Sequence, residues 1–156
     1  MTSSHPASTA KIFGHPIHPM LVPFPIVFFV SAFVSDLIYV SGGESGWATA
    51  SMWLLAAGLV TALLAALAGL ADFFGDQRVR ALKDARLHLV GNVTAVVIEA
   101  VNLFLRYGSG AEIIDSLGII LSGVVALILV FTGWKGGELV FRHGVGVADH
   151  DPARTR

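Results

Sequence analysis

The sequence predicts an all-α integral membrane protein: a four-helix bundle of up-down-up-down topology with both termini in the cytoplasm. Of its 156 residues, 54% are hydrophobic and only 13% are charged, whereas a typical soluble domain has about 25% charged residues. Apolar windows of about 20 residues, long enough to cross a bilayer, recur four times. They predict helices at about 19–40, 48–72, 87–106 and 113–143.

The distribution of charge predicts the orientation. Short connections between the windows make successive helices antiparallel neighbours, which puts both termini on one side. Of the ten basic residues, only Arg106 falls on the other side. By the positive-inside rule the basic side is cytoplasmic. The basic residues on that side are Lys11, Arg78, Arg80, Lys83, Arg86, Lys135, Arg142, Arg154 and Arg156.

The bundle should occupy residues 12–147, between a flexible arm at 1–11 and a flexible tail at 148–156. The first helix has an unusual start, because His15 and His18 each precede a proline and should therefore adopt extended backbone. Regular helix is expected only from near Pro25. Irregular backbone at membrane depth needs protein around it, so the histidine segment should pack against the end of the bundle.

Glycines mark close contacts in the second and fourth helices. Gly58 and Gly69 lie among alanines at spacings that allow two helices to approach closely. Gly133, Gly136 and Gly137 interrupt the fourth apolar window near the basic side, where close backbone approach is their natural use. The sequence contains no convincing internal repeat.

Potential metal ligands gather where the four helices end on the basic side. The chain has no cysteine, so imidazole and carboxylate are its only strong ligands. They suit iron, zinc, copper or manganese held by facing helices. Alternatively, two of the histidines, including His88, hold haem b axially, or the cluster is a polar network that joins the helix ends. The six candidates are His15, His18, Asp72, His88, Glu138 and His143.

Two further residues support this cluster, and a second polar feature follows it along the third helix. Asn92 lies one turn from His88 and could orient its ring, while Arg142 is a charge partner. From His88 the helical spacing continues through Glu99, Asn102 and Arg106 on one face. Such a face should point into the bundle. There Asp36 would share Arg106, as a structural group or as part of a proton or ion path.

Several motifs resemble a bacterial family of small inner-membrane proteins catalogued as domain of unknown function 2231. The resemblance covers nearly all of residues 12–147 and implies a four-helix protein of the bacterial inner membrane. The family has no agreed activity, so it implies no catalytic residues. The motifs are Gly-His-Pro-x-His-Pro at 14–19, Val-Pro-Phe-Pro at 22–25, Gly69-Leu70 with Asp72, His88 with Asn92, Gly133-Trp134, Gly-Gly-Glu-Leu-Val at 136–140, and Arg-His-Gly-Val-Gly-Val at 142–147.

These observations predict a multi-pass protein whose histidine cluster binds a redox-active metal or haem, with a role in electron transfer or metal handling. The alternative is a non-catalytic accessory or assembly subunit of a larger membrane complex, in which the cluster is structural. A transporter is third, since four helices are few unless the protein forms a homo-oligomer. The lipid bilayer is the expected partner, and nucleic acid is not. The sequence offers neither a nucleophile with its base nor a phosphate-binding loop.

Overall fold

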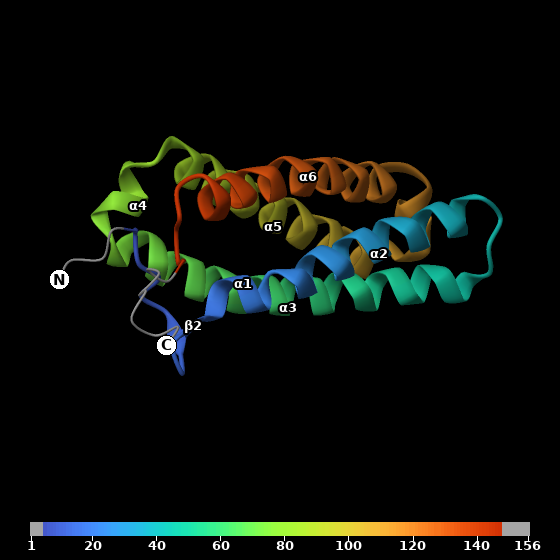
Figure 1. Cartoon of the computed structure of the whole chain (residues 1–156). Coiled ribbons are helices and arrows are strands. Elements are labelled where there is room, and N and C mark those ends of the chain that lie inside the picture. The colour runs from blue at the N-terminus through green and yellow to red at the C-terminus, as the bar shows by residue number, and fades with distance from the viewer. Residues whose placement is uncertain (1–4, 148–156) are drawn as a thin grey trace.

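The computed structural model describes residues 5–147 and is almost entirely helical. The predicted tail at 148–156 and the first four residues of the predicted arm lie outside the described part. Figure 1 shows the long helices side by side along one common direction. These helices are α2 (Pro23–Val40), α3 (Ser45–Gly75), α5 (Lys83–Ser109) and α6 (Ile119–Phe141).

The helices pack as two pairs, α2 with α3 and α5 with α6, and the pairs meet along α2–α6 and α3–α5. A tight turn at residues 41–44 joins α2 to α3, and the short helix α4 (Gln77–Ala81) leads from α3 to α5. The chain reverses again after α5 at Gly110, whose φ is 70°. A 3₁₀ turn, η1 (Gly110–Ile113), and a π-helical turn, η2 (Ile114–Gly118), complete this reversal.

Within residues 5–147, three helical segments are long and apolar enough to cross a membrane: Ile17–Val40, Ser45–Gly75 and Lys83–Phe141. The third has 59 residues, and because it turns back at Gly110, α5 and α6 lie side by side (Figure 1). The predicted all-α class and the packing of apolar helices against one another are confirmed. The number and direction of membrane crossings stay predictions.

Three helix starts differ from the expected ones. α3 and α5 begin at Ser45 and Lys83, because polar residues at a helix end can continue the helix beyond the lipid core. The last long helix begins at Ile119 instead of about 113, since η1 and η2 occupy the preceding residues.

The start of the bundle also corrects one expectation. His15 does lie in extended backbone, in strand β2 (His15–Pro16), which pairs with β1 (Lys11–Ile12) in a hairpin. The expectation for His18 was wrong, because His18 lies in the short helix α1 (Ile17–Leu21). Pro19 falls in the first turn of α1, where its missing N–H would have had no helical partner.

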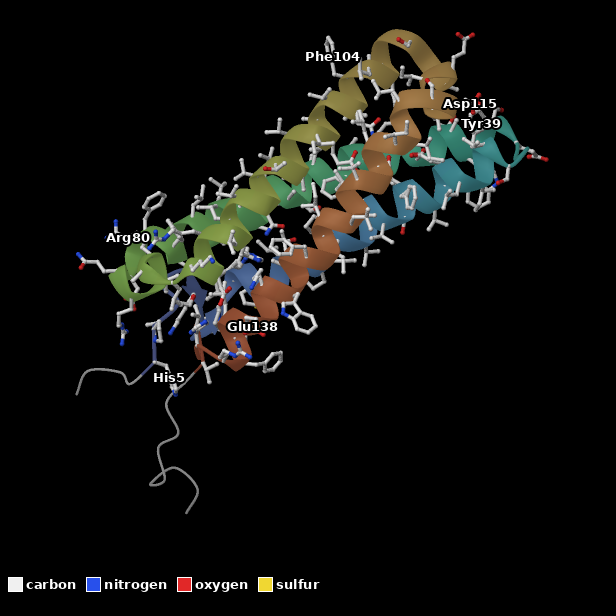
Figure 2. The ribbon with its side chains drawn as sticks, turned by 90° about the horizontal axis from the view of Figure 1, so that it is seen from above. His5, Tyr39, Arg80, Phe104, Asp115 and Glu138 are labelled. Carbon is white, nitrogen blue, oxygen red and sulfur yellow. The ribbon has the colours of Figure 1, made fainter. Side chains whose placement is uncertain are left out.

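Small and medium side chains fill the space between the four helices. Leu55 and Val125 are fully buried, and Phe29 is 2% exposed. A Cβ added to Gly58 would lie 2.5 Å from the Phe29 ring, which explains the glycine at this contact. The outer surface is apolar as well: Phe104 is 77% exposed and points away from the bundle (Figure 2). A surface of this kind needs lipid around it.

Candidate functional site

The predicted ligands all lie toward one end of the bundle, which we call the histidine end. Figure 2 shows His5, Arg80 and Glu138 at this end and Tyr39 and Asp115 at the opposite one. Of the six predicted ligands, the structure brings two into ring contact. The centroids of the His18 and His88 rings are 6.0 Å apart, and the ring planes are perpendicular.

Each of these rings is fixed by a backbone carbonyl of the neighbouring long helix. His18 Nδ1 lies 2.8 Å from the Ala65 oxygen on α3, and His88 Nδ1 lies 2.9 Å from the Thr132 oxygen on α6. A carbonyl oxygen only accepts a hydrogen bond, so both Nδ1 atoms carry the proton. Within residues 5–147 neither Nε2 has a hydrogen-bond partner, which leaves two lone pairs available. Histidines that bind metals are commonly oriented in this way.

A glycine lies beside each ring, one helical turn after the carbonyl that the ring contacts. A Cβ at Gly69 would lie 2.8 Å from His18 Cε1, and a Cβ at Gly136 would lie 3.2 Å from His88 Cε1. The Nδ1–Cε1 edge of each imidazole therefore rests directly on helix backbone. The close approach expected of the fourth-helix glycines is confirmed at Gly136.

The two halves of the bundle repeat this arrangement, although the sequence showed no repeat. In each half a histidine near the start of the first long segment contacts a carbonyl of the second. Asp36 and Arg106, which pair with each other, are separated by 70 positions, as are His18 and His88. The histidines thus occupy equivalent places in the two helix pairs and face each other between them.

The other predicted ligands have different partners. His143 Nε2 lies 3.1 Å from Asp84 Oδ2, and Lys135 Nζ donates to the other oxygen of Asp84, Oδ1, at 2.8 Å. Glu138 pairs with the exposed Arg142 at 2.8 Å, and His15 is exposed in the hairpin. Among residues 5–147, no group of three or more His, Cys, Asp or Glu side chains could hold a metal ion. A metal role for these residues stays a prediction.

Asn92 acts on His88 through the backbone. Its Nδ2 donates to the His88 carbonyl at 2.7 Å, and its Oδ1 accepts from the Thr132 hydroxyl at 3.3 Å. The oxygen that orients the His88 ring belongs to the same Thr132. Asn92 therefore joins α5 to α6 beside the ring.

Asp72 is the anchor of the N-terminal arm. Its Oδ1 accepts from the backbone N–H groups of Thr9 and Ala10 at 2.7 and 2.8 Å, and from the Ser8 hydroxyl at 2.9 Å. Nearby, hydrogen bonds from Arg78 lower the pKa of Asp76 to about 2. The described part of the predicted flexible arm is thus held across the histidine end by carboxylates.

We expect Asp72→Ala to release the arm while the helices stay folded. The N–H groups of Thr9 and Ala10 would lose a charged acceptor, and each such bond contributes about 1.5–3 kcal/mol. Their hydrogen exchange should rise at least about tenfold. Exchange mass spectrometry measures this, with Asp84→Ala as the control because Asp84 contacts Lys135 and His143 instead. Equal protection at 9–10 in Asp72→Ala and wild type would contradict the assignment.

At the opposite end of the bundle, the predicted polar face forms a buried network. Arg106 donates to both oxygens of Asp36 at 2.7 Å, and the two side chains are 1% and 0% exposed. The Arg106 Nε donates to Asn102 Oδ1 at 3.0 Å, and Asn102 Nδ2 donates to Glu99 Oε2 at 2.9 Å. The structure therefore brings together Glu99, Asn102 and Arg106, which the helical spacing predicted on one face. Asp36, the expected partner of Arg106, lies with them.

Sequence reasoning missed two hydroxyls of this network. Ser51 on α3 accepts from Arg106 and donates to Asp36, and Ser122 on α6 also bonds both groups. A serine within an apolar helical run was the available signal, but nothing in the sequence showed what each serine faces. Asp84 was missed because it lies among charged residues at the start of a helix.

The comparison with protein families agrees with this architecture. A family model described as predicted membrane protein (DUF2231) matches residues 14–149. The chain belongs to the DUF2231 family. The resemblance inferred from the motifs is thereby confirmed, and the chain is a membrane protein in contact with a lipid bilayer. The DUF2231 match starts in the hairpin turn before His15 and covers all four long helices, so it includes both facing histidines and the buried network. No curated protein and no solved structure matches the chain.

Proposed function

We propose that this DUF2231 protein binds haem b in the bacterial inner membrane through His18 and His88, and that it transfers electrons. The observation that carries the proposal is the pair of facing imidazoles. Each has its Nδ1 bonded to a backbone carbonyl and its Nε2 without a hydrogen-bond partner among the described residues, with 6.0 Å between the ring centroids.

The number of ligands favours haem over a bare metal ion. Zinc in proteins is held by three or four side chains, whereas the described residues offer no group of three that could hold an ion. Haem brings its own equatorial nitrogens, so two axial histidines complete its coordination. A two-histidine site therefore fits haem without any further ligand.

The distance between the rings is also suitable. To hold one group together, the two imidazoles must lie close to each other on facing helices. The observed separation is 6.0 Å. The glycines beside the rings let both imidazoles lie against the backbone of α3 and α6.

His18 and His88 would hold the haem, and the bound group would supply one-electron chemistry. The chain would hold the group and orient its ligands. Hydrogen bonds from Nδ1 to the Ala65 and Thr132 carbonyls fix the tautomer. They also make each Nε2 more basic and so a stronger ligand for a metal.

The orientation that we propose has four membrane crossings with both termini in the cytoplasm. Arg106, the only basic residue assigned to the far side, is buried in an ion pair, while exposed Glu44, Glu112 and Asp115 remain there. The histidine end carries the exposed basic side chains, which favours the cytoplasm. Labelling of single cysteines at Lys83 and Glu44 in spheroplasts tests this: only the cysteine at 44 should react with an impermeant reagent.

The visible spectrum of the purified protein tests haem binding. Wild-type protein expressed with haem supply should show a Soret band, and His18→Ala and His88→Ala should each lose most of it. His15→Ala and His143→Ala are matched controls that should keep the band, because neither residue faces the pair. A colourless wild-type protein, or loss of the band only in the control variants, would overturn the proposal.

Elemental analysis separates haem from the other metal assignments. Iron in proportion to the Soret band supports haem, whereas stoichiometric zinc, copper or manganese supports the metal-handling role. A second candidate, an accessory subunit of a larger complex, is favoured by the fact that His18 and His88 each tie two helices together. It predicts colourless protein, free of metal, that co-purifies with a stoichiometric partner.

A further inference from the structure

We propose that Glu99 is a proton-binding site inside the membrane and that it exchanges its proton with the end of the bundle opposite the histidines. Glu99 is fully buried on α5, about 24 Å along the helix from its start at 1.5 Å per residue. This inference does not depend on haem binding, because it rests on a different group of residues.

The first support is an unpaired oxygen. Glu99 Oε2 accepts from Asn102, but within residues 5–147 Oε1 is the buried side-chain polar atom with no hydrogen-bond partner. An ionised carboxylate has only acceptors, so it would leave a charged oxygen without a partner in an apolar interior. A proton on Oε1 removes that charge.

The second support is the balance of charge around Glu99. Asp36 from α2 and Arg106 from α5 are the charged groups of the network, and they form a bidentate pair. The elements α3 and α6 contribute the neutral hydroxyls of Ser51 and Ser122. Since Asp36 already neutralises Arg106, Glu99 has no counterion among the described residues, and the neutral acid is the form that this interior accommodates.

The direction of exchange follows from what lies on either side of Glu99. Toward the far end, hydrogen bonds run from Glu99 through Asn102 to Arg106 and Ser122. Toward the histidine end, the next layer is the apolar core, which includes Phe29, Ala95 and Leu129. Polar side chains can hold water molecules that carry a proton, whereas an apolar layer excludes water, so the route should open toward the far end.

Infrared spectroscopy of the full-length protein in detergent tests both parts. A protonated Glu99 should give a carboxylic-acid C=O band above the amide I region at neutral pH, and the band should be missing in Glu99→Gln, which keeps the shape and the bond to Asn102. In D₂O the band should shift to lower frequency, because the proton is exchangeable. An identical spectrum in Glu99→Gln would show an ionised Glu99, and a band that never shifts would show a closed site; either result overturns the proposal.

Two asparagines on the same helix test the route. Asn102→Leu should slow the deuterium shift of the Glu99 band at least about tenfold, whereas Asn92→Leu, on the histidine side, should leave it unchanged. Ser122→Ala is a milder second variant of the far-end route, in case Asn102→Leu does not fold, and it should also slow the shift. A slower shift in Asn92→Leu alone would place the route at the histidine end and overturn the assignment.

Discussion

Replacing Arg106 with methionine should lower the free energy of unfolding by about 3–5 kcal/mol, the typical cost of breaking a buried ion pair. The substitution leaves the Asp36 carboxylate fully buried without a counterion, and it also removes donors to Ser51 and Ser122. Thermal or denaturant unfolding in a mild detergent measures the change, with circular dichroism to follow the helices.

Arg142→Met is the matched control, because the Arg142–Glu138 pair is 2.8 Å long, close to the 2.7 Å of the buried pair, but its Arg side chain is 73% exposed. Exposed pairs contribute about 0–1 kcal/mol, so this variant should unfold almost like wild type. The double variant Asp36→Leu with Arg106→Met should recover much of the loss, since it removes the unpaired charge. Equal effects of Arg106→Met and Arg142→Met would show that the buried pair does not hold the far end together.

Gly69→Ala should displace the His18 ring and cost about 1–3 kcal/mol of stability, the usual effect of inserting a methyl group into a packed site. The added Cβ would lie 2.8 Å from His18 Cε1 and 2.9 Å from Nδ1. The ring must then leave the Ala65 carbonyl. Nitrogen NMR of the histidine rings, together with unfolding and the Soret band, follows its position.

Gly133→Ala is the control for this effect, because it lies in α6 and its added Cβ would meet nothing within 4 Å. It should gain about 1 kcal/mol, the difference in helix propensity between the two residues. Gly136→Ala should fall between them, since its Cβ would lie 3.2 Å from His88. If Gly69→Ala behaves like Gly133→Ala, the ring does not rest on the α3 backbone.

Much of the fold could be predicted because it depends on residue type and order. A run of apolar residues forms a helix inside a membrane, because its backbone N–H and C=O groups find no water there and must hydrogen-bond to one another. The helical spacing of Glu99, Asn102 and Arg106 likewise placed them on one face before any partner was known. The start of the first helix was harder, because the two prolines that follow His15 and His18 have opposite consequences: one ends a strand and the other lies in the first turn of α1.

The candidate site was predictable only in part. The antiparallel order of the helices was enough to predict that the potential ligands lie at one end. It could not predict which of them touch, because contact depends on side-chain direction over a few ångströms. His18 and His88 face each other since each is fixed by a carbonyl on the adjacent helix. Asp72 and Glu138 instead face the arm and Arg142.

The sequence by itself determined that the chain is a helical membrane protein with histidines at one end and a polar helical face inside. Hydropathy and the helical spacing of polar residues depend only on residues close together in the chain, so the sequence shows them directly. Only the tertiary structure decided that His18 pairs with His88, that Asp36 pairs with Arg106, and that each pair joins equivalent positions in the two halves. These relations depend on how four helices rotate about their own axes when they pack, and no single helix contains that information.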